Sequence, residues 1–337
     1  MANNLILINA ISREKRVALI ENGNLAEFYT ERLHERGILG NIYKGKVVRV
    51  LPGMQAAFVD IGQEKAAFLY VADALPPKLK EVEGDEEEGA ESEPAEPEVR
   101  PDITELVSTG DQIVVQVKKA PVGTKGARIT THITLPGRFL VFMPHNSHVG
   151  VSRRIDDESE RQRMKDLLST LKGSSDWGLI ARTVAEGVPR VKLERELDVL
   201  RRLWEEISRR IETAGAPSLI HEDLDLPLRA VRDLLDDEIG SIIVDTESEY
   251  QRIREFVAST VPMKTECVEL YNQTAPIFDR YGVEAELERA MDRTVWLKSG
   301  GYIVIDPTEA LTVIDVNTGK FVGHRSLEQT ITHINIE

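Results

Sequence analysis

Asp315 and Asn317, near the end of the chain, have the types and spacing that could support metal chemistry. The apolar runs 302–305 and 311–316 flank a group of turn formers, which predicts a β-hairpin. Side chains two apart on a strand point to the same side, so this carboxylate and amide could hold a divalent cation or position a water. The same residues, followed by Gly319, also suit a strand that ends in a self-capped turn, and on this stretch alone the turn is favoured.

Arg182 and Thr183 form a second candidate site, at the end of an apolar run over 177–183 that predicts a strand. A guanidinium beside a hydroxyl suits a terminal phosphate, because arginine can donate two parallel hydrogen bonds and threonine can donate one. The chain also contains 57 acidic residues. An arginine paired with a surface carboxylate is therefore an equal alternative.

Phe58 and Phe68 lie in a segment whose pattern favours a small closed β-barrel. Short strands follow one another there, predicted over 42–50, 56–62, 66–69 and 107–119. The two rings fall on adjacent predicted strands, where they could stack on bases. The alternative is that both fill the barrel core, as phenylalanine usually does.

Basic residues beyond these strands are further candidates for contacts to nucleic acid. Lys119 and Lys125 flank a glycine-containing loop that suits a phosphate backbone. Arg153 and Arg154 form a basic pair just before a helix predicted over 156–172.

The two ends of the first 290 residues are expected to share one sheet. The runs 5–9, 16–20 and 25–29 predict a meander, with Asn22-Gly23 as a hairpin turn. Helices and strands alternate later, predicted over 228–235, 241–244, 248–259, 268–271 and 284–291. This alternation favours an α/β layer that completes the sheet begun by the meander.

Charge and cysteine content exclude several classes of protein. The net charge is −15, but ten acids and no base lie between residues 81 and 99, which leaves about −5 for the rest. We expect a disordered acidic insertion over 78–101. The single cysteine, Cys267, excludes an intrachain disulfide or a cysteine-cluster zinc site in this chain. With neither a secretory signal nor an apolar membrane span, the sequence suits a cytoplasmic protein.

Motifs in order along nearly the whole chain resemble the ribonuclease E/G family of bacterial endoribonucleases. They lie at 21–23, 40–45, 56–62, 125–126, 152–154, 178–183, 297–301, 309–311 and 315–319. The resemblance implies a multidomain fold of the α+β and α/β classes. Its parts are a ribonuclease-H-like structural region (1–36 and 227–290), an S1 barrel (37–131), a 5′-sensor region (132–226) and the start of a DNase-I-like catalytic region (291–337).

The resemblance also implies roles for the candidate residues. Asp315 resembles a catalytic magnesium ligand, with Asn317 holding its surroundings, while Arg182 and Thr183 resemble the pair that grips a 5′-monophosphate. The residues that resemble RNA contacts are Phe58, Phe68, Lys119, Lys125, Arg153 and Arg154. The implied chemistry is attack of a Mg²⁺-activated water on single-stranded, AU-rich RNA, in RNA processing and decay.

One departure from the family concerns the second metal ligand. The family places a second aspartate on a strand beyond the helix that starts near Leu327, and its zinc link and dimerising part lie further on, whereas this sequence ends at Glu337. Asp306 is predicted to be a turn residue rather than a substitute ligand. We therefore expect weak Mg²⁺ binding, impaired cleavage and a monomer or weak dimer. The alternative function is an RNA- and 5′-phosphate-binding module that does not cleave.

Overall fold

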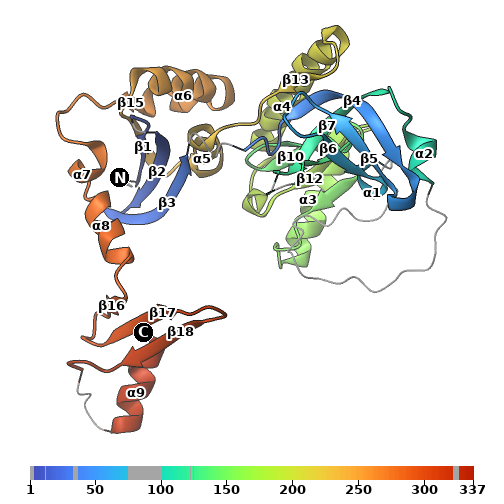
Figure 1. Ribbon diagram of the computed structural model, residues 1–337. Coiled ribbons are helices and arrows are strands. Elements are labelled where there is room, and N and C mark those ends of the chain that lie inside the picture. The colour runs from blue at the N-terminus through green and yellow to red at the C-terminus, as the bar shows by residue number, and fades with distance from the viewer. Residues whose placement is uncertain are drawn as a thin grey trace.

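The computed structural model describes residues 4–11, 13–32, 37–74, 101–121, 123, 125–321 and 326–337. These residues form a mixed α/β protein with four β-sheets (Figure 1). The acidic segment 78–101 lies outside the described residues, apart from residue 101. No helix in the described ranges is long and apolar enough to cross a membrane.

The N-terminal sheet joins both ends of the first 290 residues, as predicted. Its strands are β1 (Asn4–Asn9), β2 (Glu14–Glu21), β3 (Asn24–Arg32), β14 (Ile239–Val244) and β15 (Val268–Leu270), in the order β15-β14-β1-β2-β3. Strand β1 runs parallel to β14 and antiparallel to β2. Asn22 and Gly23, both with positive φ, form the β2–β3 turn that the Asn-Gly pair predicts.

Helices cover both faces of this sheet because alternate strand residues are apolar on each side. Ile6 and Ile8 pack in one core with α5 (Leu226–Leu234) and α6 (Glu247–Thr260). Leu7 points the other way, into a core with α7 (Ile277–Arg280) and α8 (Val283–Ala290). The sheet is thus buried on both sides, as in an α/β layer.

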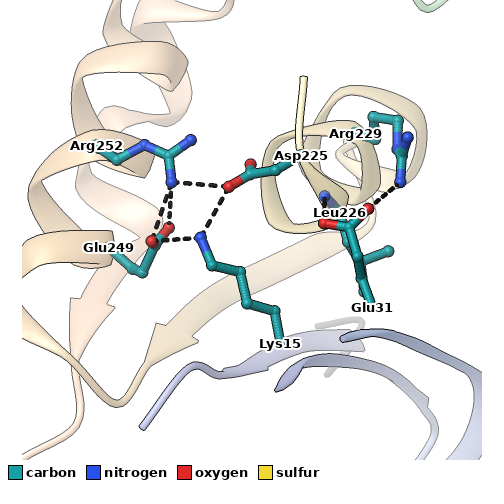
Figure 2. A network of polar contacts seen from close by, with 7 residues as sticks. All are labelled: Lys15, Glu31, Asp225, Leu226, Arg229, Glu249 and Arg252. Atoms are coloured by element: carbon teal, nitrogen blue, oxygen red, sulfur yellow. Dashed lines mark hydrogen bonds and ion pairs between the residues drawn. The ribbon is translucent and has the colours of Figure 1, made fainter. Parts of the chain in front are cut away.

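A network of charged residues ties α5 and α6 to this sheet (Figure 2). Lys15 on β2 donates to Asp225 (2.8 Å) and to Glu249 (2.6 Å), and Arg252 donates to the same two carboxylates. The Asp225 residue is only 2% exposed. It lies directly before α5, where the chain returns to the N-terminal sheet, so the network fixes this return.

The second sheet is the predicted barrel. Its strands are β4 (Ile42–Leu51), β5 (Ala56–Asp60), β6 (Ala67–Tyr70), β7 (Gln112–Lys119) and β8 (Arg128–Thr130). The order β4-β5-β6-β8-β7 closes through the β7–β4 pairing, and β13 (Ser218–His221) pairs with β4 as an addition. Two short helices, α1 (Val71–Ala74) and α2 (Ile103–Leu106), lie against it.

Two details of the predicted barrel strands are corrected. The strand predicted over 107–119 begins only at Gln112, because Ser108 and Asp111 form a turn in which the Ser108 amide donates to the Asp111 carboxylate (2.7 Å). Strand β8 has only three residues and was not predicted.

The third sheet follows the barrel in the chain. It has the order β11-β12-β10-β9 and is covered by α3 (Glu158–Lys172) and α4 (Arg190–Thr213). The strands are β9 (Leu135–Pro136), β10 (Leu140–Met143), β11 (Val149–Val151) and β12 (Gly178–Ala181). Only β12 was predicted among them. A side chain at Gly178 would meet the carbonyl oxygens of Asn146 and His148 at 2.2–2.3 Å, so glycine is required there.

The last sheet contains the predicted hairpin. It has the order β16-β17-β18 and is followed by α9 (Leu327–Ile336). The strands are β16 (Thr294–Trp296), β17 (Tyr302–Pro307) and β18 (Thr312–Asn317). The prediction that Asp306 lies in the turn is wrong, because Asp306 pairs with Val313 inside the ladder. In Figure 1 this sheet stands apart from the barrel.

Candidate functional site

A row of basic and aromatic residues crosses the barrel in register. Arg49 on β4 is paired with Phe58 on β5, and Phe58 is paired with Phe68 on β6. Phe68 is in turn paired with Arg128 on β8, and Arg128 with Lys119 on β7. Directly paired residues share one face of a sheet. The barrel therefore presents two rings flanked by three cations, which we call the barrel row.

The two phenylalanines of the barrel row lie on the outside of the barrel. Their strand neighbours Val59 and Leu69 are fully buried, whereas both rings are half-buried and stand outside the barrel core. The ring centroids are 5.3 Å apart at an interplanar angle of 79°. The alternative that both fill the barrel core is therefore wrong, and the two rings remain accessible for stacking.

Tyr70 extends this aromatic surface and was missed from the sequence. Tyr70 is 41% exposed, and its ring centroid lies 4.3 Å from that of Phe68. The guanidinium of Arg128 lies 4.9 Å from the Tyr70 centroid and pairs with Asp73 (2.7 Å). The signal was present, because a residue two positions after Phe68 on a strand shares its face.

The two lysines predicted to contact RNA are both exposed, at the end of β7 and in the loop before β8. Lys119 belongs to the barrel row, and Lys125 lies three residues before Arg128. The Lys65 ammonium also reaches this loop and donates to the Gly123 carbonyl oxygen (2.8 Å). These lysines and Arg128 therefore lie on the β7–β8 side of the two phenylalanines, and Arg49 lies on the β4 side.

The residues predicted to bind a terminal phosphate lie at one edge of the third sheet. Strands β11 and β12 are parallel, so the residues that follow them meet at the same edge. The hydroxyls of Ser152 and Thr183 are hydrogen-bonded at 2.9 Å. Arg153 and Arg154 follow Ser152 directly in the chain, so this basic pair begins one residue beyond the Ser152–Thr183 hydrogen bond.

Arg182 is held by three acceptors, all through Nη1. This atom donates to the carbonyl oxygens of Gly137 (2.6 Å) and Arg138 (3.2 Å) and to Oδ1 of Asp233 (2.7 Å). Pairing with a carboxylate, the alternative that the sequence left open, therefore does occur. Asp233 also accepts from Arg232.

Asp233 alone does not neutralise the two arginines with which it pairs. Burial alone would raise the pKa of Asp233, but the hydrogen bonds and charge of Arg232, together with those of Arg182, outweigh it and lower the pKa. The carboxylate is therefore ionised at neutral pH, and the two arginines and one aspartate carry a net charge of about +1.

Asp315 and Asn317 point to the same side of β18, as the spacing predicts. The Asn317 amide donates to Oδ2 of Asp315 (3.0 Å), and the Asp315 side chain is exposed. Tyr302 on β17 is the strand partner of Asn317, and its ring centroid lies 5.1 Å from that of Trp296. An oriented carboxylate with an open oxygen is the kind of ligand that Mg²⁺ uses together with waters.

Asp306 lies on the same face of the hairpin as Asp315 but has its own partner. It is two positions along β17 from Val304, which pairs with Asp315. Arg293 donates to both carboxylate oxygens of Asp306, and this lowers the pKa of Asp306. Within the described ranges, no three His, Cys, Asp or Glu side chains come together as a metal site. Of these two hairpin carboxylates, Asp306 is thus paired with a cation, whereas the hydrogen bond that Asp315 accepts from Asn317 uses only Oδ2.

Comparison with known proteins finds relatives over nearly the whole chain. A sequence model of the Ribonuclease E/G family matches residues 134–337. Ribonuclease G of Salmonella typhimurium and of Escherichia coli K12 are each 48% identical over 332 residues, which cover 98% of this chain and 66% of theirs. Ribonuclease E of Haemophilus influenzae is 38% identical over 336 residues, covering 98% of this chain and 34% of the relative.

The chain belongs to the ribonuclease E/G family, which confirms the resemblance seen in its motifs. It spans 66% of the length of the ribonuclease G proteins that it matches.

Proposed function

We propose that this chain carries the RNA-binding and part of the catalytic machinery of a Mg²⁺-dependent endoribonuclease. Its substrate is single-stranded, AU-rich RNA with a 5′-monophosphate, in RNA processing and decay. The barrel row is the observation that carries the proposal, because it joins stacking surfaces and cations on one accessible face. The names of the relatives, ribonuclease G and ribonuclease E, support the cleavage of RNA.

Each site has a separate task in this proposal. Phe58 and Phe68 stack on bases, and the cations beside them contact phosphates. Further contacts to phosphates along the bound RNA come from Lys125, Arg153 and Arg154. Arg182 and Thr183 bind the 5′-monophosphate by charge-assisted hydrogen bonds.

Cleavage is assigned to Asp315 and Asn317. A bound Mg²⁺ would supply an activated water and stabilise charge on the scissile phosphate. Asp315 is the carboxylate that would hold the ion. Asn317 orients this carboxylate through the 3.0 Å hydrogen bond that its amide donates to Oδ2. The exposed oxygen Oδ1 then remains for the cation.

The finer division of the chain is part of the same proposal. The five-stranded sheet with helices on both faces supports a ribonuclease-H-like structural region at 1–36 and 227–290. The closed barrel supports an S1 domain at 37–131, and the third sheet supports a 5′-sensor region at 132–226. The hairpin sheet supports assigning 291–337 to a DNase-I-like region. A cytoplasmic location fits the single cysteine and the RNA substrate.

A second candidate function is an RNA- and 5′-phosphate-binding module that does not cleave. The observation that favours it is that Asp306, the other carboxylate on this face of the hairpin, is paired with Arg293, and that no group of three metal-ligating side chains occurs in the described ranges. A single carboxylate with waters binds Mg²⁺ weakly.

Cleavage of a 5′-monophosphorylated AU-rich oligonucleotide separates the two functions. We expect slow cleavage that needs millimolar Mg²⁺, and a loss of at least about 100-fold in Asp315→Ala, the scale of removing one transition-state contact. Asp306→Ala is the matched control and should keep most of the rate. Binding without cleavage at any Mg²⁺ concentration would favour the binding module. Equal cleavage by Asp315→Ala would remove Asp315 from the site.

A further inference from the structure

Asp233 links the candidate phosphate-binding arginine to a different part of the molecule. It lies on α5, which packs in the core of the N-terminal sheet, whereas Arg182 follows β12 of the third sheet. The 2.7 Å ion pair between them joins residues 51 apart in the chain. Both side chains are about one third exposed, so the pair is reachable from solvent.

The bonds to Arg182 leave one edge of its guanidinium available. All of its hydrogen bonds to described residues use Nη1. The group is planar and rigid, so fixing Nη1 also fixes the direction of the Nε–Nη2 edge. Two parallel donors on such an edge match two oxygens of a phosphate.

The other acceptors of Arg182 are themselves held in place. The carbonyl oxygens of Gly137 and Arg138 face the guanidinium. On the other side of this loop, the amides of Arg138, Phe139 and Leu140 donate to the Glu196 carboxylate at 2.6–2.9 Å. Nη1 is therefore bracketed by a fixed loop and by Asp233.

We propose that Asp233 is a positioning residue for 5′-phosphate recognition, which holds Arg182 by Nη1 so that its Nε–Nη2 edge meets the phosphate. The inference rests on the proposed role of Arg182. Arg232 shares the Asp233 carboxylate, so the carboxylate orients Arg182 without cancelling the positive charge of the site. Asp233 itself does not contact the RNA.

This role predicts an effect opposite in sign to simple electrostatics. Replacing a carboxylate near an anion site by a neutral amide should strengthen phosphate binding if only charge matters. If Asp233 positions Arg182, the same change should weaken it. Asp233→Asn keeps the side-chain shape, so the sign of the change decides between the two.

The test compares binding of matched 5′-monophosphate and 5′-hydroxyl oligonucleotides by fluorescence anisotropy, without Mg²⁺. In Asp233→Asn we expect the monophosphate preference to fall by about tenfold, the size of one charge-assisted hydrogen bond, with 5′-hydroxyl affinity unchanged. Asp237→Asn is the matched control. Asp237 lies four residues after Asp233 and pairs with Lys192 at the surface, so this change removes the same charge without touching Arg182. An increased or unchanged preference in Asp233→Asn would overturn the proposal.

A double-mutant cycle shows whether Asp233 acts through Arg182. In Arg182→Ala the preference should be lost, and adding Asp233→Asn should change nothing further. A preference in the double variant that differs from that of Arg182→Ala would contradict the positioning role. An unchanged preference in Arg182→Ala would instead refute the proposed function of Arg182, so the two failures are distinguishable.

Arg182→Lys provides a second route that leaves Asp233 and its packing intact. Lysine can still pair with Asp233, but it has no second edge to present to a phosphate. We expect the preference to fall about as far as in Asp233→Asn, while the melting temperature stays near that of the parent chain. A full preference in Arg182→Lys would contradict the role assigned to the Nε–Nη2 edge.

Discussion

Two clusters of arginine, lysine and carboxylate groups in this chain use the same chemistry with different charge balance. In the network around Asp225, two cations meet two carboxylates, and the Asp225 side chain is 1% exposed (Figure 2). In the cluster around Arg182, two arginines share the single carboxylate of Asp233, which is 34% exposed.

The difference separates a structural site from a binding site. In the Asp225 network each cation is already matched by a carboxylate, and removing a buried carboxylate leaves its cationic partners less well compensated. An exposed cluster with excess positive charge contributes little to stability but attracts an anion. The Asp225 network should therefore affect folding, and the Arg182 cluster should affect RNA recognition.

The largest expected effect is on stability in Asp225→Asn. Lys15 and Arg252 would lose a shared acceptor, which should lower the free energy of unfolding by about 3–5 kcal/mol. Urea denaturation measures this change. The control Glu286→Gln breaks an exposed pair with Arg289 on α8 and should cost about 1 kcal/mol or less. Equal effects of the two changes would remove the distinction between the clusters.

Acid should weaken the same network. Burial alone would raise the pKa of Asp225, but hydrogen bonds from Arg252 and Lys15 outweigh it and lower the pKa to about 2. A depressed pKa stabilises the fold fully above the ordinary value near 3.8, and this contribution disappears as the pH falls towards 2.

We therefore expect the parent chain to lose about 2 kcal/mol more than Asp225→Asn between pH 5 and pH 2. Urea titrations at stepped pH would show it. Parallel pH profiles of the two proteins would mean that Asp225 does not titrate as described.

A smaller effect is expected from the aromatic rings of the barrel row. Phe58→Ala and Phe68→Ala should each weaken RNA binding by about 1–3 kcal/mol, the range of one base stacked on one ring. Both rings lie outside the core, so melting should change little. Tyr29→Ala, which removes an exposed ring from β3, is the control and should bind RNA normally. Weaker folding with unchanged binding would show that the two phenylalanines serve the barrel instead.

Much of the fold could be predicted, because long periodic runs dictate their own structure. The meander, the barrel strands over 42–70, the helix over 156–172 and the hairpin all follow from apolar spacing. Strands β8 to β11 have two to four residues and are defined by their pairing with other strands. Such short segments carry no period of their own, so they could not be predicted.

The site residues divide in the same way. The common side of Asp315 and Asn317 follows from strand geometry alone. The exposure of Phe58 and Phe68 could not be predicted from local strand geometry, because the register of the barrel decides which face of each strand points inward. The pairing of Arg182 with Asp233 joins two separate sheets through α5, and no local pattern could indicate it.

The most direct test of the division between the two clusters measures two quantities in Asp225→Asn and Arg182→Ala. One is the free energy of unfolding, and the other is the affinity ratio for 5′-monophosphate over 5′-hydroxyl RNA. We predict that Asp225→Asn lowers the first and keeps the second, at a temperature where it is folded, and that Arg182→Ala does the reverse. A loss of the affinity ratio in Asp225→Asn, or an unchanged ratio in Arg182→Ala, would contradict this division.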